Sequence, residues 1–549
     1  MGRFLYSTSF LIMLTMLFVS CSKGDDMVKS SPVFSCKNIV IDGRYGAHIA
    51  GVPLKPIITA TFDDKVNIGT LKTAISVSGP AQKPIELIFT PTNQDSTVQI
   101  QLVDALNSIT NYVFSINTSL KSADNRSLSG DYTIQFTTII DTLDKRPRIS
   151  DDQLMDTIQR QTFSYFWEFA HPVSGMIRER NTSGDLVTTG GTGFGIMAIV
   201  AAVHRGFISR EDGLNRIITI ADFLEQKTTR YHGAFAHWID GATGATIPFS
   251  SKDDGGDLVE TSFLIAGLLC AAEYFDRSET TEQHLRETVQ RLWHDVEWDW
   301  YTNGKNVLYW HWSPKYNWEI NLPIKGWNEA LITYILAAAS PTHGIQPEVY
   351  HQGWASGGQM KNGNSYYNYT LPLGPALGGP LFFEHYSFLG INPMKLQDQY
   401  ADYRLQTVNH TLINRGYCIR NPQNYYGYSD KCWGLTASDT RNGYTAHSPT
   451  NDKAVITPSA ALSSLPFTPD ESLKAMRFFY YKLGDFIFGK YGFYDAFSLH
   501  YGWKSNTWLA IDQGPIMIMI ENYRSGLIWE YTMRNKDIRN GLDKLGFTY

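Results

Sequence analysis

Four carboxylates lie within eight residues of this chain, around a glycine pair and directly before an apolar segment at residues 261–270. They are Asp253, Asp254, Asp257 and Glu260. A loop jointed by glycines that leads into a buried helix would hold these acids at the edge of the interior, where spacing and desolvation separate their pKa values. Carboxyl groups with separated pKa values are what the cleavage of a sugar linkage requires.

The spacing of Asp257 and Glu260 also fits a capping box, in which the two side chains only satisfy free N–H groups at a helix start. Residues three apart on a helix lie about 5–6 Å from one another at Cβ, and like charges at that spacing are destabilising. Because two further acids crowd the same loop, the pattern favours a functional site over capping alone.

A further acid, Glu329, opens an apolar segment two residues after Trp327. If Glu329 faces a cleft, desolvation beside the indole raises its pKa and keeps a proton available at neutral pH, as a general acid requires. The alternative is a first-turn glutamate that is stabilised by the helix dipole.

Later in the chain, acids and histidines stand beside aromatic residues near the ends of expected helices. Such groups are typical of sugar sites, where polar side chains bind hydroxyls and a ring stacks against the sugar. No metal-binding spacing accompanies His385 or His447, so we expect no metal and no cofactor. The predicted substrate-binding residues are Asp253, Asp254, Trp327, Glu384, His385, Tyr386, Trp433, Asp439, His447 and Asp512.

The charge balance argues against nucleic acid as a partner. Lys and Arg number 47 and Asp and Glu 53, so the net charge of −6 is spread over 549 residues. Aromatic residues make up 13% of the chain, and many lie beside Gly, Asn or Asp. This composition suits an uncharged polysaccharide or oligosaccharide, and we expect a monomer.

The N-terminus has the pattern of an exported lipoprotein. Arg3 precedes an apolar stretch at residues 10–19, which is too short to span about 30 Å of hydrocarbon comfortably. Residues 18–21 resemble a bacterial lipobox, with Phe18 where Leu is commoner, so we expect a signal peptide over 1–21, a lipid on Cys21 and a tether over 22–31. Ordinary cleavage nearby is the alternative.

The expected location is therefore the outer membrane of a Gram-negative bacterium, through the lipid anchor. Lys23, Asp25 and Asp26 resemble the acidic export signal of Bacteroidetes surface lipoproteins, although a charged tether would look the same. The sequence leaves open whether the protein lies at the cell surface or on the periplasmic face.

The remaining cysteines show no paired metal-binding spacing. Cys270 ends an apolar segment, so a buried free thiol is expected there. Cys418 and Cys432 lie 14 residues apart, which in an exported protein is compatible with a disulfide or with two free thiols.

Short runs with period-two alternation predict an all-β domain, an antiparallel sandwich, over residues 32–141. Turn clusters separate the runs, and the block resembles the bacterial Ig-like sandwich modules that stand between an anchor and an enzyme. We interpret it as a spacer, with glycan binding as the alternative. A charged, proline-bearing linker follows at 142–150. The expected strands cover 57–62, 85–89, 97–102, 112–116 and 132–137.

Beyond residue 151 the periodicity is helical. Six helical hairpins closed into an all-α (α/α)6 barrel over 151–549 would bring the loops of one end together as a cleft. An open solenoid would show a fixed sequence repeat, and none is evident. The expected helices cover 152–170, 191–206, 209–228, 257–275, 279–295, 324–339, 379–389, 397–414, 457–465, 469–484, 513–525 and 527–546.

Four segments of the helical part together resemble the glucoamylase-like domain of glycoside hydrolase family 144. They are residues 325–336, 379–393, 433–439 and 509–526, in the same order over 152–549. Asn392 departs from the familiar Asp at a peripheral position. The resemblance implies an (α/α)6 barrel that hydrolyses β-1,2-glucan with inversion and without a metal.

By motif, the resemblance implies that Glu329 is the general acid and that Asp257 and Glu260 are needed for activity. The base is less settled; we rank Asp257 or Glu260, acting through water, ahead of Asp439 and Asp512, which we assign to substrate binding. The prediction is an endo-β-1,2-glucanase-like enzyme that forms sophoro-oligosaccharides. The alternatives are an exo-acting, sophorose-releasing or an α-glucan (glucoamylase-type) hydrolase on the same fold, and a non-catalytic surface glycan-binding lipoprotein.

Overall fold

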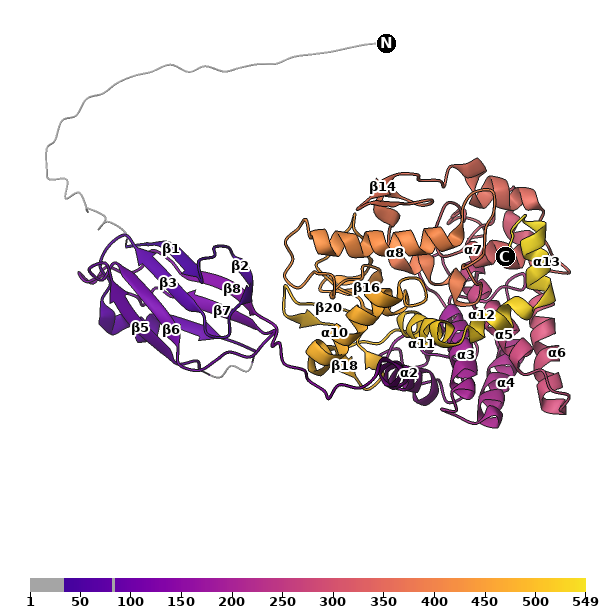
Figure 1. Ribbon diagram of the computed structural model, residues 1–549, viewed down its shortest axis with the longest axis horizontal. Helices are drawn as coiled ribbons and strands as arrows, with labels where there is room; N and C mark the ends of the chain where they lie inside the picture. The colour runs from indigo at the N-terminus through magenta and orange to yellow at the C-terminus, as the bar shows by residue number, and fades with distance from the viewer. Residues whose placement is uncertain (1–33, 81–83) are drawn as a thin grey trace, which may run out of the picture.

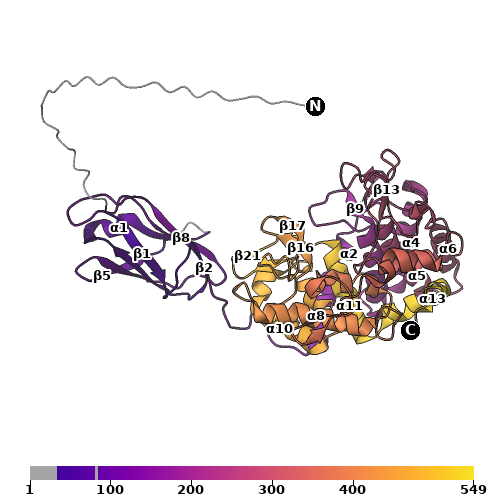
Figure 2. The same ribbon diagram turned by 90° about the horizontal axis from the view of Figure 1, so that it is seen from above.

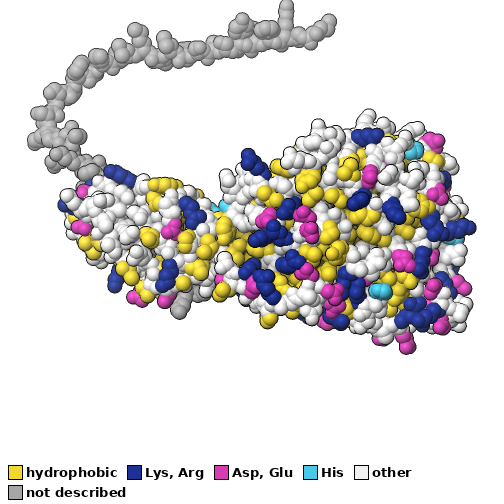
Figure 3. Space-filling view, in the orientation of Figure 1, with side chains coloured by type: hydrophobic (Ala, Val, Ile, Leu, Met, Phe, Trp, Pro, Cys, Tyr) yellow, Lys and Arg dark blue, Asp and Glu magenta, His cyan; other side chains and the backbone are white. Residues whose placement is uncertain are grey.

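The computed structural model describes residues 34–80 and 84–549, which form a β-sandwich and a larger helical domain (Figure 1). Cys21, the expected signal peptide and the expected tether lie outside these residues. No helix within the described ranges has both the length and the apolarity needed to cross a membrane. On the face drawn in Figure 3, basic and acidic side chains are interspersed over the helical domain.

The sandwich consists of two four-stranded sheets whose alternating side chains form one core. One sheet has the order β1 (Cys36–Ile41), β3 (Ile57–Phe62), β6 (Thr97–Leu102), β5 (Leu87–Thr92). The other has the order β2 (His48–Val52), β8 (Tyr132–Thr138), β7 (Asn111–Ile116), β4 (Ile75–Ser78). The β2–β8 pair is parallel, which corrects the expectation of a purely antiparallel sandwich.

The helical domain alternates along the chain between buried helices and helices with one buried face. The buried ones carry apolar or small residues on all sides; they are α3 (Thr189–His204), α5 (Leu258–Tyr274), α7 (Leu331–Ala339), α9 (Pro458–Leu462) and α11 (Ala510–Arg524). The half-buried ones are α2 (Asp151–Glu168), α4 (Arg210–Lys227), α6 (Thr280–His294), α8 (Tyr403–Arg420), α10 (Pro469–Ile487), α12 (Leu527–Arg534) and α13 (Lys536–Lys544).

Glycines set the distance between α3 and its two buried neighbours. A Cβ on Gly193 would lie 2.2 Å from the Phe263 carbonyl oxygen of α5, and one on Gly267 would lie 2.3 Å from the Gly193 carbonyl oxygen. On the other side of α3, a Cβ on Gly191 would lie 2.7 Å from the Ala510 Cβ of α11. Helix α3 therefore packs backbone to backbone against α5 and lies directly against the start of α11.

Four expected helices differ from the observed ones. Residues 379–389 form two 3-10 turns, η6 (Leu381–Glu384) and η7 (Ser387–Leu389), because Gly379 has a positive φ of 85° and Pro380 follows it. The helix expected from 324 begins only at Leu331. The one expected at 397–414 begins after Asp402, which caps it, and the last expected helix is divided at Asn535, which caps α13.

The two domains contact each other directly. Asn111 in the sandwich donates a 2.8 Å hydrogen bond to the Tyr501 carbonyl, and the Ile140 N–H donates a 3.0 Å hydrogen bond to the Tyr426 hydroxyl. In the helical domain, Cys270, Cys418 and Cys432 are buried free thiols.

We expect Gly193→Ala to destabilise the helical domain, because the added methyl group meets a backbone carbonyl that cannot rotate away. Overpacking of this kind costs about 1–3 kcal/mol and occasionally more. Denaturant unfolding followed by far-UV circular dichroism measures the loss. Asn215→Ala on the exposed face of α4 is the control, with a change within about 0.5 kcal/mol. Equal stability of Gly193→Ala and the wild type would contradict the close helix contact.

Candidate active site

Asp257 caps α5 and also anchors two other segments. It ends β12 (Gly256–Asp257), which pairs with β13 (His311–Trp312). Its Oδ1 accepts a 2.9 Å hydrogen bond from the Glu260 N–H. Its Oδ2 lies 2.9 Å from His237 Nδ1 and accepts a 3.2 Å bond from Trp310 Nε1. The capping expected from the sequence is therefore real, but it uses only one oxygen of this buried carboxylate.

Glu260 does not complete the capping box, because its side chain reaches across to α3. Its Oε2 accepts a 2.7 Å hydrogen bond from the Gly190 N–H and one of 3.3 Å from the Thr188 hydroxyl. A Cβ at position 190 would lie 2.7 Å from that oxygen, so only glycine allows the contact. Burial raises the pKa of Glu260, while the charge of His237 and the N–H at the start of α3 favour its ionised form.

Glu329 lies in the turn just before α7 and is partly buried. Ser387 fixes this turn, because its hydroxyl donates to the Glu329 carbonyl and accepts a 3.0 Å bond from the Ile332 N–H. Burial raises the pKa of Glu329 to about 7, and the charges of Glu260 and Asp257 act in the same direction. This carboxyl therefore keeps a proton up to near-neutral pH, beside two carboxylates of α5.

The two acids that precede Asp257 differ in their surroundings. Burial and the charge of Asp257 raise the pKa of Asp253 to about 7, and its Oδ1 lies 3.1 Å from His311 Nε2. Asp254 instead accepts a hydrogen bond from the Ser313 hydroxyl, which ties the acid loop to the segment after β13. Asp253 thus belongs to the acid cluster, while Asp254 holds the loop.

His237 supplies the positive charge of this cluster. Burial lowers its pKa, but the charges of Glu260, Asp257 and Asp253 outweigh that effect and raise it to about 9. The ring also stacks on Phe249 at a centroid distance of 4.1 Å. Neither His237 nor Trp310 was identified from the sequence, because both lie far from the acid motif along the chain and only the fold brings them to it.

A second acid cluster forms around Asp512 in the first turn of α11. Asp512 Oδ1 accepts a 3.0 Å bond from the Ser459 hydroxyl at the start of α9. Asp439 on β16 (Ala437–Thr440) faces Arg180 Nη1 at 3.2 Å, and its N–H donates to Asp495 Oδ2 at 2.6 Å. Burial raises the pKa of Asp512 to about 7. Burial also raises the pKa of Asp495, and the charge of Asp512 is the second cause of that shift. Asp495 was missed because a lone acid in an aromatic run gives no sequence signal.

Tyr386 lies within electrostatic reach of both clusters. Burial raises its pKa well above the usual value, and the charges of Asp512, Glu329 and Glu260 contribute. Its ring packs against Phe194 of α3 and Phe263 of α5. In Figure 2, β13 and β16 lie on the same side of the helical domain. The acids therefore gather at the N-terminal ends of α5, α7 and α11, around the start of α3.

Five further predicted substrate-binding residues are buried and lie among interior groups. Trp327 Nε1 donates to Glu384 Oε1 at 2.8 Å, and this fully buried carboxylate also contacts Gln406 and His410. His385 and His447 contact the hydroxyls of Ser464 and Ser438, and burial lowers the pKa of each to about 3. Residues beside helix ends can face inward, and only the tertiary structure shows which ones do. The five are Trp327, Glu384, His385, Trp433 and His447.

The described residues contain no group of three or more His, Cys, Asp or Glu side chains arranged to hold a metal ion. The histidines near the acids are used in pairs with carboxylates, as His237 is with Asp257. What the arrangement offers is a group of neighbouring carboxyls, among them Glu329 and Asp253 with pKa values raised to about 7, which suits acid–base chemistry.

Comparison with known proteins places the two domains in known families. The family described as "Putative glucoamylase" matches residues 321–536, and the family described as "Bacterial Ig-like domain" matches residues 46–138. The chain is 46% identical over 421 residues to the exo β-1,2-glucooligosaccharide sophorohydrolase (non-reducing end) of Parabacteroides distasonis. That alignment covers 72% of this chain, and the chain spans 58% of the length of that relative.

Two solved structures are similar over nearly their whole length. A putative glucoamylase from Bacteroides uniformis is 54% identical with a TM-score of 0.73, covering 73% of this chain and 99% of that one. The endo-β-1,2-glucanase of Chitinophaga pinensis, solved with sophorotriose and glucose, is 52% identical with a TM-score of 0.72 and the same coverage.

We expect His237→Gln to destabilise the protein in a pH-dependent way. Because the folded state raises the pKa of His237 to about 9, its contribution to stability is complete below the unfolded value of about 6.5 and is lost as the pH rises through 9. The difference in melting temperature between wild type and variant should therefore be largest below about pH 6.5 and shrink towards pH 9.

Thermal unfolding at a series of pH values measures this difference. His284→Gln, at an exposed histidine paired with Asp222, is the control and should change the melting temperature little at any pH. A wild-type advantage over His237→Gln that stays constant from pH 6 to 9 would show that the ion pair with Asp257 is not formed.

Proposed function

Because the chain belongs to the glucoamylase-like family of glycoside hydrolases, family 144, we propose that it hydrolyses β-1,2-glucan to sophoro-oligosaccharides. One observation carries the proposal: a carboxyl whose pKa is raised to about 7, Glu329, lies beside the buried acids Asp257 and Glu260. A protonated acid next to ionised carboxylates is the pair that glycoside hydrolysis uses.

In the proposed mechanism, Glu329 donates its proton to the glycosidic oxygen as the bond from that oxygen to the anomeric carbon breaks. A carboxylate beside it, Asp257 or Glu260, takes a proton from a water molecule. The oxygen of that water bonds to the anomeric carbon from the opposite face. The products are two shorter glucans, and the anomeric configuration is inverted. The two carboxyl groups then need a separation of roughly 6.5–9.5 Å, which leaves room for the water.

We assign the base to Glu260 ahead of Asp257 on the basis of their hydrogen bonds. Both oxygens of Asp257 are engaged, one by the Glu260 N–H and the other by His237 and Trp310. For Glu260, the contacts within the described residues hold Oε2 in place, and Oε1 is left for water. Asp257 then acts as a positioning residue that orients α5 and His237.

The second acid cluster fits substrate binding. Carboxylates at Asp439 and Asp512 accept hydrogen bonds from sugar hydroxyls, and the buried Asp495 beside them retains a proton that stabilises the pair. Tyr386, within electrostatic reach of both clusters, offers a ring edge and a hydroxyl to the same glucan chain. Asp253, in the loop before α5, contributes a further carboxyl for sugar hydroxyls.

An exo-acting enzyme that releases sophorose is the second candidate. The 46% identity to the exo β-1,2-glucooligosaccharide sophorohydrolase favours exo cleavage. The 52% identity to the endo-β-1,2-glucanase favours endo cleavage. The lengths of the earliest products separate the two: mixed oligosaccharides support endo cleavage, and a single disaccharide supports exo cleavage. Release of reducing ends from starch and not from β-1,2-glucan would contradict both.

We further propose that the helices close into an (α/α)6 barrel. The alternation of buried and half-buried helices supports this, with α3, α5, α7, α9 and α11 on the inner wall. The 3-10 turns η6 and η7, between α7 and α9 in sequence, would take the sixth inner position.

The lipid anchor on Cys21 and a location at the outer membrane are also proposals. The lipobox-like residues 18–21 support them, and the sandwich would then hold the enzyme away from the membrane as a spacer. We propose that the protein acts as a monomer.

We expect Glu329→Gln to lower kcat on linear β-1,2-glucan by about 10²–10⁴-fold, because the amide has the same shape but donates no proton to the leaving oxygen. Reducing-end release under saturating substrate measures the loss. Glu287→Gln, on the exposed face of α6, is the matched control and should retain wild-type turnover. Near-wild-type turnover of Glu329→Gln would refute the assignment of the general acid.

A further inference from the structure

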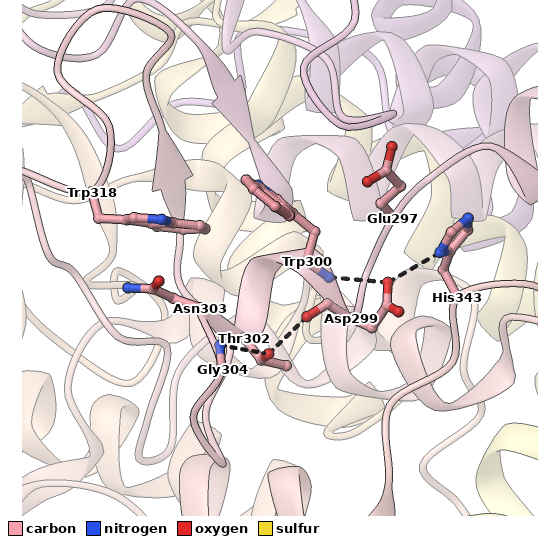
Figure 4. A pocket seen from close by; sticks show the side chains of 8 residues that line it. All are labelled: Glu297, Asp299, Trp300, Thr302, Asn303, Gly304, Trp318 and His343. Carbon is pink, nitrogen blue, oxygen red and sulfur yellow. Dashed lines mark hydrogen bonds and ion pairs between the residues drawn. The ribbon is translucent and has the colours of Figure 1, made fainter.

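A pocket of about 410 Å³ is lined by residues that belong to neither acid cluster (Figure 4). It is formed by η2 (Trp300–Thr302), by Asn303 and by Trp318, with Glu297, Asp299 and His343 completing the wall. The volume lies within the range of small-ligand sites, which is about 300–1,000 Å³. Nothing in the proposed reaction uses these residues.

Two neighbouring indoles dominate one side of the pocket. The centroids of Trp300 and Trp318 are 6.3 Å apart with a tilt of 36°. Trp300 is 41% exposed, and one of its faces stacks on His232 at 3.8 Å. Trp318 packs edge-on against Tyr301 and Tyr309. Each indole is therefore backed by other rings, which holds the pair in place before a ligand arrives.

Polar groups line the rest of the pocket. In Figure 4, Asn303 lies below Trp318, while Glu297 and His343 stand on the opposite side, with Asp299 between. Asp299 Oδ1 accepts a 3.0 Å bond from the Trp300 N–H and lies 3.1 Å from His343 Nδ1. Glu297 lies 3.0 Å from His232 Nδ1. The wall therefore offers hydrogen bonds, and each acid already has a partner.

This combination fits a pyranose better than other ligands. A sugar ring has an apolar face that stacks on an indole and hydroxyls that bond to amides and carboxylates. A phosphate or another anion would meet two acids, and the described residues form no metal cluster here.

The pocket is structurally continuous with the acid loop. The Tyr301 hydroxyl donates to the Tyr231 carbonyl at 2.6 Å. A Cβ on Gly256 would lie only 2.1 Å from the Tyr301 hydroxyl oxygen. The Tyr309 N–H donates to the Tyr301 carbonyl, and the next residue, Trp310, bonds to Asp257. A saccharide on Trp300 and Trp318 would thus lie against the segment that positions Asp257.

We propose that this Trp300–Trp318 pocket is an accessory binding site for a β-1,2-linked gluco-oligosaccharide segment, separate from the catalytic centre. It holds one part of a glucan chain near the acid loop, so that the effective concentration of further linkages at the catalytic acids rises. The identity of the sugar rests on the proposed function, whereas the presence of a saccharide site rests on the pocket.

Calorimetric titration of the full chain with sophoropentaose tests the proposal, in the inactive Glu329→Gln background. We expect two binding events. Trp300→Ala and Trp318→Ala should each weaken one event by about tenfold and leave the other, because a stacked ring is lost. Trp318→Phe, which keeps a ring, should retain both events. Tyr45→Ala, at an exposed ring of the sandwich, is the matched control and should also retain both.

Should the alanine variants lose their fold, Asn303→Gly removes a polar wall group at a positive φ of 49° that glycine adopts freely, and it should weaken the same event. A single binding event in the Glu329→Gln background, or two unchanged events in both tryptophan variants, would overturn the proposal. So would binding of malto-oligosaccharides in this pocket with none of the β-1,2-linked chain. Two events in a protein whose wild type hydrolyses no glucan would support the pocket and refute only the proposed function.

Discussion

The close contact of α3 with α5 and α11 is the constraint on which the rest of the site depends. Glycines at 190, 191, 193 and 267 let the backbones approach where any side chain would collide. As a result, acids as far apart in sequence as Asp253 and Asp512 meet at one end of the helical domain. That end is where α5, α7 and α11 begin, and helix N-termini carry partial positive charge, which reduces the cost of burying several carboxylates together.

The same geometry gives the neighbouring acids different electrostatic surroundings. Burial raises the pKa of both Glu260 and Glu329, but Glu260 also receives the Gly190 N–H and faces His237, which favour its charge. For Glu329, the neighbouring charges of Glu260 and Asp257 oppose ionisation. Of the two, only Glu260 therefore has a histidine charge that favours its ionised form, although the net pKa shift is upward for both. Position relative to a helix start and a histidine, rather than residue type, makes these surroundings different.

The acid loop, Glu329 and the sandwich strands β3, β5, β6, β7 and β8 were predictable because local patterns encode them. The contribution of His237, Trp310 and Asp495 was not, since each reaches the acids only through long-range packing. For the same reason, Glu384 and His447 looked like ligand groups in the sequence but form hydrogen bonds with His410 and Ser438 inside the protein. The segment 379–389 looked helical by composition, and Gly379 and Pro380 prevent a regular helix there.

The pH dependence of kcat/KM on a short β-1,2-gluco-oligosaccharide tests the central claim most directly, since it reports the essential groups of the free enzyme. Because the acid must be protonated and burial places the pKa of Glu329 at about 7, kcat/KM should fall about tenfold per pH unit above that value. The same alkaline limb should persist in Asp253→Asn, whose native carboxyl also has a raised pKa. A flat profile from pH 6.5 to 9, or loss of the limb in Asp253→Asn, would contradict a proton held on Glu329.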